Sequence, residues 1–131
     1  KGTSTVQVSD ILAKEPKLVM IYFSMHTCPP CREFTPLLTA LYEEMNEDSC
    51  QFEVIFFSGD GKKEAFDHYY AEMPWYALPW KDARLKPVAK EFKVKGLPQL
   101  IVLRRDGNLV SSNAVEQVTQ MGPMAIEEWL A

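Results

Sequence analysis

The sequence has no long hydrophobic run and no basic tract. Its longest wholly apolar stretch covers residues 18–23, far short of the roughly 20 apolar residues that a membrane-spanning helix needs. Lys and Arg number 14, Asp and Glu number 18, and the net charge is −4. Proteins that bind nucleic acids usually present a clustered basic surface. We therefore expect neither a membrane span nor a nucleic-acid partner.

Cysteine is scarce, with Cys28, Cys31 and Cys50 as the only three. An odd number of cysteines in a chain of this size argues against a secreted disulfide scaffold. The sequence around Lys1 also lacks the pattern of a signal peptide. These absences favour a reducing compartment, which we expect to be the cytoplasm or also the nucleus. Because position 1 is Lys rather than Met, the sequence also fits a segment of a longer protein.

The composition that remains is that of an ordinary globular protein. The chain has 131 residues, of which 47% are hydrophobic and 24% charged, and this excludes disordered and fibrous classes. The length suits one hydrophobic core and leaves little room for a second. We expect residues 1–131 to form a single domain and the protein to be a monomer.

Hydrophobic patterns in the first half predict alternating strands and helices. Residues 17–24 and 52–58 are short apolar runs, typical of strands buried on both faces. Apolar residues at spacings of three and four then predict helices over 29–46 and 62–73, the first continuing past Pro36 with a kink. This order implies a parallel strand pair joined by a right-handed crossover.

The second half predicts an antiparallel end to the same sheet. In chain order we expect an aromatic-rich connection, a short helix, a hairpin and a C-terminal helix, over residues 73–80, 84–92, 99–112 and 123–131. The hairpin prediction depends on the Asp-Gly pair at residues 106 and 107, which lies between two extended runs. The fold class is therefore α/β, with a central mixed sheet flanked by helices on both faces.

The most informative residues are Cys28, Pro29, Pro30 and Cys31, between the first strand and its helix. Unpaired N–H groups at a helix N-terminus stabilise a thiolate, so the pKa of Cys28 should be lowered. Cys31 lies one helical turn later and can attack a mixed disulfide formed at Cys28. The spacing predicts thiol–disulfide exchange, with Cys28 as the nucleophile and Cys31 as the resolving thiol.

A pair of cysteines at this spacing can also be half of a structural zinc site. The other potential ligands are Cys50, His26 and His68, which form no second closely spaced pair. We therefore expect no metal. We also expect no organic cofactor, because electrons arrive as a dithiol and leave as one.

Two further residues can be interpreted either as functional or as having no role in the reaction. His26 precedes Cys28 by two residues and, if protonated, would favour the Cys28 thiolate; the alternative is a solvated loop histidine. Cys50 follows Glu47 and Asp48, whose charges should keep it unreactive. The alternative for Cys50 is a regulatory thiol.

Several motifs resemble thioredoxin-fold proteins of the tryparedoxin and nucleoredoxin group. They cover most of residues 17–112 and are Tyr22-Phe23-Ser24, Cys28-Pro29-Pro30-Cys31-Arg32, Phe34-Thr35-Pro36, Phe52-Glu53-Val54-Ile55-Phe56, Met73-Pro74-Trp75 and Gly96-Leu97-Pro98. The resemblance implies a thioredoxin fold and a protein-disulfide reductase active in cell redox homeostasis. The partners that it implies are protein disulfide substrates and an upstream dithiol or disulfide reductase.

The resemblance also implies roles at the site. Pro98 would be a cis-proline packed against the disulfide, which would leave the Leu97 backbone free to pair with an extended substrate. The other substrate-binding residues that it implies are Thr27, Pro29, Pro30 and Trp75.

The sequence also departs from the group's pattern. Thr27 stands where members usually have Trp, and residues 59–61 read Gly-Asp-Gly where tryparedoxins have Trp-Asp-Glu. Tyr22 occupies the position of the buried Asp found in most thioredoxins, so a buried carboxylate cannot handle protons there. We expect poor use of trypanothione, because recognition of a cationic dithiol calls for an aromatic face and carboxylates.

A second function remains open from the sequence. Some nucleoredoxin-type proteins resemble redox-sensitive binding modules, which hold a protein partner and release it when the dithiol oxidises. Turnover of a small disulfide would indicate the enzyme. Partner affinity that changes with redox state, with little turnover, would indicate the binding module.

Overall fold

A five-stranded sheet organises the part of the chain that the computed structural model describes, residues 15–131. The strand order is β3-β2-β1-β4-β5. The central strand β1 (Leu18–Ser24) pairs in parallel with β2 (Phe52–Ser58) and antiparallel with β4 (Gln99–Arg104). The sheet is mixed, so this part of the prediction is confirmed.

Both edges of the sheet are short strands. β5 (Leu109–Ser111) pairs antiparallel with β4 after a turn in which Gly107 has a φ of 95°, a conformation that glycine adopts readily. At the other edge, β3 (Tyr76–Ala77) pairs in parallel with β2. The sequence predicted only an irregular connection around β3, because a two-residue strand leaves no periodic pattern.

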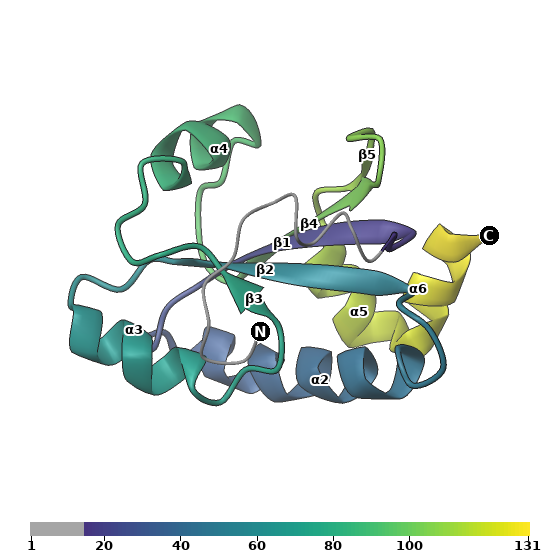
Figure 1. The fold of residues 1–131 in the computed structure, drawn as a ribbon, viewed down its shortest axis with the longest axis horizontal. Helices are drawn as coiled ribbons and strands as arrows, with labels where there is room; N and C mark the ends of the chain where they lie inside the picture. Colours follow the sequence, from purple (N-terminus) through teal and green to yellow (C-terminus); the bar gives the residue numbers. More distant parts are fainter. Residues whose placement is uncertain (1–14) are drawn as a thin grey trace.

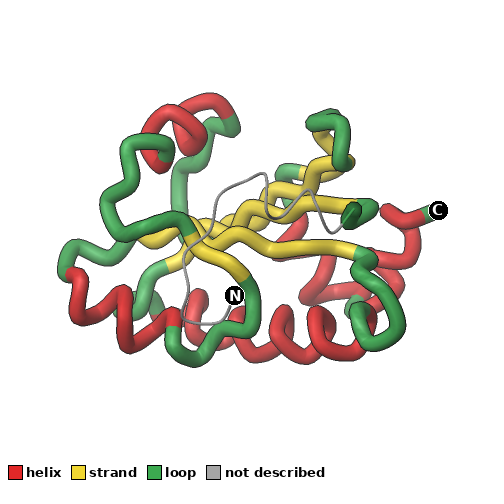
Figure 2. Tube along the Cα trace, viewed as in Figure 1, coloured by secondary structure: helices red, strands yellow, loops and turns green. Residues whose placement is uncertain are grey.

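Helices cover both faces of the sheet, as predicted (Figures 1 and 2). One face carries α2 (Pro29–Met45), α3 (Lys63–Tyr70), α5 (Ala114–Met121) and α6 (Pro123–Leu130). The opposite face carries α4 (Leu85–Glu91). Among the described residues, no helix combines the length and apolar character needed to cross a bilayer.

The alternation of side chains along β1 divides the core in two. Met20 and Tyr22 face the larger core, which is formed with α2, α3, α5 and α6. Ile21 and Phe23 face a smaller core, to which α4 contributes only partly buried residues. Since both faces of β1 are covered, the continuous apolar run in its sequence is explained.

Two helical predictions need correction. α3 ends at Tyr70 rather than Met73, because the chain tightens into i+3 turns, with the Met73 N–H donating to the Tyr70 carbonyl at 2.9 Å. Pro74 follows directly, and a residue before proline is disfavoured in a helix. α5 was not predicted; it is a short helix with only two buried residues, Ala114 and Val118.

Candidate redox site

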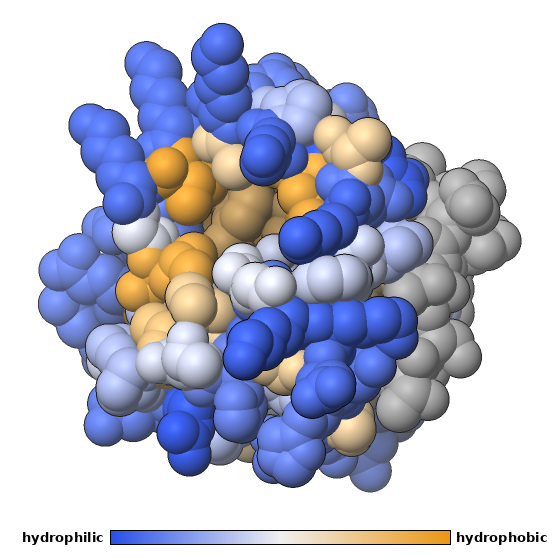
Figure 3. Space-filling view, turned by 90° about the vertical axis from the view of Figure 1, so that its left-hand side faces the viewer, coloured by the Kyte–Doolittle hydropathy of each residue, from blue (hydrophilic) through white to orange (hydrophobic). Residues whose placement is uncertain are grey.

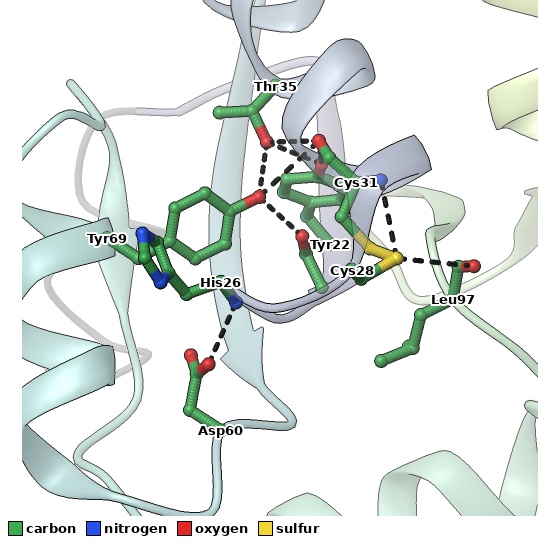
Figure 4. The surroundings of a disulfide bond; sticks show 9 residues. Tyr22, His26, Cys28, Cys31, Thr35, Asp60, Tyr69 and Leu97 are labelled. Atoms are coloured by element: carbon green, nitrogen blue, oxygen red, sulfur yellow. Dashed lines mark hydrogen bonds between the residues drawn. A yellow bond between two sulfur atoms is a disulfide. The ribbon is translucent and has the colours of Figure 1, made fainter.

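Cys28 and Cys31 form a disulfide at the N-terminus of α2 (Figure 4). Cys28 is the N-cap residue, and its Sγ accepts a hydrogen bond from the Cys31 N–H at 3.3 Å. Pro29 and Pro30 occupy the first helical positions, where a missing N–H leaves no helical hydrogen bond unmade. The sulfur of Cys28 therefore lies at the positive end of the helix, a position that stabilises a thiolate.

The two cysteines differ sharply in accessibility. Cys31 is fully buried, whereas Cys28 is partly exposed. Thr27, Pro29 and Pro30 are all exposed around Cys28. Of the two sulfur atoms, only that of Cys28 can therefore be approached from solvent.

Leu97 and Pro98 lie on the other side of the disulfide, just before β4. The peptide bond between them is cis, so the expectation from the family resemblance is confirmed. The Leu97 carbonyl oxygen lies 3.8 Å from Cys28 Sγ, while its side chain extends away from the disulfide (Figure 4). The Leu97 backbone therefore lies next to the sulfur of the more exposed cysteine.

A network of buried hydroxyl groups lies behind Cys31. Thr35 Oγ1 donates to the Cys31 carbonyl at 2.9 Å and hydrogen-bonds with Tyr22 at 2.7 Å and with Tyr69 at 2.6 Å. The Tyr69 hydroxyl also hydrogen-bonds with Ser24 Oγ at 2.6 Å. Burial, followed by the nearby Tyr69, raises the pKa of Tyr22 above its usual value. The position that holds an Asp in most thioredoxins is thus occupied by a neutral phenol.

Asp60 anchors the loop that leads into Cys28. Its Oδ1 accepts a hydrogen bond from the His26 N–H at 2.8 Å, and its Oδ2 accepts one from Ser58 Oγ at 2.8 Å. The carboxylate is almost completely buried, at 5% exposure. No role for Asp60 was predicted from the sequence; the available signal was that it is the one residue shared with the Trp-Asp-Glu motif.

The ring of His26 does not point at the disulfide. It lies edge-on to the ring of His68, with centroids 5.2 Å apart. It also lies edge-on to the ring of Tyr69, at 5.7 Å (Figure 4). The structure therefore favours the interpretation in which His26 is a loop residue.

The substrate-binding role implied for Trp75 is wrong in this structure. Trp75 is fully buried, and its ring lies edge-on to Tyr22 at 6.0 Å and to Tyr42 at 5.7 Å. It packs in the larger core behind the site, so a bound substrate cannot contact it. The Met73-Pro74-Trp75 motif matches that of its relatives in sequence, but in this fold the indole of Trp75 is packed inside the core.

Cys50 lies away from the redox site. It lies two residues before the start of β2, whereas Cys28 follows the opposite end of the parallel strand β1. Its partly buried Sγ is 3.9 Å from a carboxylate oxygen of Glu53. Within residues 15–131, no group of three or more His, Cys, Asp or Glu residues is placed to hold a metal ion.

Comparison with known proteins agrees with this geometry. The model of a family described as thioredoxin-like matches residues 15–109. A probable nucleoredoxin 1 from Arabidopsis thaliana is 44% identical over 122 residues, covering 93% of this chain and 21% of that protein. Nucleoredoxin from Danio rerio is 39% identical over 106 residues, covering 80% of this chain and 25% of that protein. The chain thus spans only about a fifth to a quarter of these relatives.

A solved structure extends the comparison to the fold. Tryparedoxin I from Leishmania major superimposes with a TM-score of 0.77 and 39% identity, covering 86% of this chain and 78% of that one. The sequence match, the shared fold and the Cys28–Cys31 pair agree with one another. The chain therefore belongs to the thioredoxin-like family, in the group that includes nucleoredoxins and tryparedoxins.

Proposed function

We propose that this domain reduces or exchanges disulfides in other proteins, with Cys28 as the attacking thiolate and Cys31 as the resolving thiol. One observation carries the proposal. The two sulfurs share the N-terminus of α2, where Cys28 is partly exposed and Cys31 is fully buried. In such an arrangement Cys28 can attack the substrate disulfide, and Cys31 can then attack the mixed disulfide that forms.

The first step begins with the reduced domain. The Cys28 thiolate, stabilised by the Cys31 N–H and the helix terminus, attacks one sulfur of the substrate disulfide. The substrate S–S bond breaks, a mixed disulfide forms at Cys28, and the first substrate thiolate leaves and takes up a proton from solvent. Exposure of Cys28 is required for this step.

The second step uses the buried thiol. Cys31 loses its proton and its thiolate attacks Cys28 Sγ. The mixed disulfide breaks, and the second substrate thiolate leaves and takes up the proton that Cys31 lost. Two electrons have passed to the substrate, and the Cys28–Cys31 disulfide remains. An upstream dithiol or disulfide reductase must restore the dithiol for the next cycle.

We assign substrate contact to the residues that surround Cys28. The Leu97 carbonyl faces Cys28 Sγ, so an extended substrate segment would pair with this backbone as an added strand. Thr27, Pro29, Pro30 and Pro98 would line the same surface. For the whole protein we propose action in a reducing compartment, the cytoplasm or also the nucleus, within cell redox homeostasis.

Turnover of a protein disulfide tests the proposal. The domain would be assayed with insulin and with a small aromatic disulfide, alongside the variants Cys28→Ser, Cys31→Ser and the matched control Cys50→Ser. We expect Cys28→Ser to abolish activity, Cys31→Ser to trap mixed disulfides, and Cys50→Ser to behave like the unmodified protein. Activity that survives in Cys28→Ser would overturn the assignment.

The same material addresses the direction of electron flow and the rival function. The reduction potential of the Cys28–Cys31 couple separates reductases from oxidases, which differ by roughly 100 mV or more. Negligible turnover combined with redox-dependent affinity for a protein partner would favour the binding module instead.

A further inference from the structure

An apolar groove lies beside the redox site, between the sheet and α4. Its volume is about 660 Å³, and its apolar lining includes Phe23 and Phe57 from the sheet, Leu85 and Ala89 from α4, and Leu97. Figure 3 shows this end of the molecule, where apolar atoms line a hollow beneath projecting hydrophilic side chains. The smaller core therefore continues to the surface here rather than being sealed by α4.

Two features keep the groove open. α4 has no fully buried residue, so it covers the sheet loosely. Gly59 also lies at the groove, and a Cβ there would come within 3.1 Å of Leu97 Cδ1. Because Gly59 has no side chain, the Leu97 side chain can pack against its backbone and line the groove.

The rim of the groove is positively charged. Lys81 and Lys86 line it, and within residues 15–131 neither forms a salt bridge. The lining carboxylates already have partners: Arg84 donates to Asp82 at 2.8 and 2.9 Å, and Asp60 holds the His26 loop. Residues 81–95 carry six Lys or Arg and two Asp or Glu, in a chain whose net charge is −4. Lys81 Nζ lies over the Trp80 ring, 4.7 Å from its centroid. Among the described residues, the rim charge that no salt bridge neutralises is therefore cationic.

Leu97 connects the groove to the reactive sulfur. Its carbonyl oxygen is 3.8 Å from Cys28 Sγ, and the same residue lines the groove. A chain that pairs with the Leu97 backbone, as proposed above, would carry the residues next to its disulfide over this groove.

The surface between α2 and α3 has the opposite charge. The charged side chains that line a second groove there are one arginine, Arg32, and four glutamates, Glu43, Glu44, Glu47 and Glu72. The carboxylates of these glutamates repel an approaching anionic segment. An acidic chain would therefore be directed away from this side and toward the lysines near α4.

We propose that the groove between the sheet and α4 binds an apolar and acidic segment of the protein substrate, next to the disulfide that Cys28 attacks. An apolar side chain of the segment would pack against Phe57 and Leu85, and its carboxylates would face Lys81 and Lys86. The inference rests on the proposed function, because the groove would give that reaction its substrate preference.

Disulfide-linked peptides test the preference. One peptide would flank its cystine with Leu-Glu-Glu, a second with Leu-Lys-Lys and a third with Ser-Glu-Glu, and a small uncharged disulfide would serve as the reference. We expect kcat/KM for the first peptide to exceed the other two by about tenfold, from two surface ion pairs or one buried Leu. The small disulfide does not reach the groove, so it reports the chemistry alone.

A matched pair of variants locates the effect. Lys86→Glu and Lys90→Glu change the charge equally at exposed positions of α4, but only Lys86 lines the groove. Binding of a serine-substituted Leu-Glu-Glu peptide would be followed by fluorescence anisotropy. We expect the Kd to rise about fivefold in Lys86→Glu and less than twofold in Lys90→Glu. Leu85→Ser, checked for folding by circular dichroism, should weaken binding about tenfold.

The outcomes separate the two proposals. Failure to turn over the small disulfide would overturn the oxidoreductase function itself. Normal turnover of the small disulfide, with equal kcat/KM for all three peptides or equal Kd values for the two lysine variants, would overturn the groove while leaving the reaction in place.

Discussion

The carboxylate of Asp60 accepts a hydrogen bond from the backbone N–H of His26 at 2.8 Å. This bond joins the loop after β2 to the loop after β1, two residues before Cys28. A second bond, from the Gly59 N–H to the Ser24 carbonyl at 2.8 Å, runs between the same loops. The approach of the chain to the redox site is thus fixed by residues more than 30 positions away in sequence.

Replacing Asp60 should therefore change the position of Cys28, although the two side chains are not in contact. Asp60→Ala removes the acceptor for two hydrogen bonds, and we expect a loss of about 2–3 kcal/mol in unfolding free energy. Cys28 alkylation should also change its pH profile, because the loop no longer holds the sulfur at the helix terminus. Asp60→Asn keeps an oxygen for the His26 N–H and should recover most of both properties. If Asp60→Ala and Asp60→Asn changed the unfolding free energy and the pH profile of alkylation equally, a positioning role for Asp60 would be contradicted.

The two active cysteines should differ in reactivity. In the reduced protein, iodoacetamide at about pH 6.5 should label Cys28 first, since a thiolate at a helix N-terminus persists at this pH. Cys31 is fully buried and should react last. Peptide mapping by mass spectrometry after timed quenching measures the order. Faster labelling of Cys31 or Cys50 would show that the roles are misassigned.

Tyr22 should contribute to stability rather than to proton transfer. Burial raises its pKa above the usual 10.0, so the folded state holds a neutral phenol and loses stability as pH rises above 10 toward the raised pKa of the folded state. Tyr22→Phe should lower the unfolding free energy by about 1 kcal/mol, because Thr35 keeps its bond to Tyr69. Denaturant titrations at pH 7 and above pH 10 should show a smaller alkaline loss in the variant. A new or missing titration in its pH–rate profile near neutrality would contradict this.

Asp82 should stay ionised in acid. Hydrogen bonds from the Arg84 side chain, and then from its backbone, lower the pKa of Asp82 from 3.8 to about 2. The stabilisation is present above pH 3.8 and disappears as pH falls toward 2. In Arg84→Ala the pKa should rise toward the ordinary value, measured by NMR of the carboxyl carbon, whereas Arg105→Ala should leave it unchanged. An unshifted pKa in Arg84→Ala would disprove the cause.

Trypanothione should be a poor reductant for this protein. Thr27, Gly59 and Gly61 replace two aromatic residues and a carboxylate that tryparedoxins present, and each lost contact costs about 1 kcal/mol, or roughly 100-fold in total. Steady-state assays should give a higher kcat/KM with glutathione or a thioredoxin reductase system. Thr27→Trp should reduce the difference in kcat/KM between trypanothione and the other reductants. A kcat/KM for trypanothione well above the others would refute the prediction.

Much of the fold could be predicted because local patterns agree with tertiary burial. The strand at residues 52–58 matches β2 residue for residue, and the first helix was predicted to within one residue of its end at Met45. β2 is a continuous apolar run that is buried on both faces, and α2 carries a regular apolar stripe that faces the core. β3 was missed because it has only two residues and is defined by its pairing with β2. α5 was missed because it is a short helix that buries only Ala114 and Val118.

The sequence by itself determined the chemistry of this protein. Two cysteines at this spacing, between a buried strand and an amphipathic helix, specify a dithiol at a helix N-terminus, because strand, turn and helix are all local in the chain. Only the tertiary structure decided what surrounds that dithiol. Asp60, Tyr69 and Leu97 reach the site from other elements, and Trp75 turns into the core instead. These arrangements depend on contacts between distant segments, and no local pattern of residues encodes them.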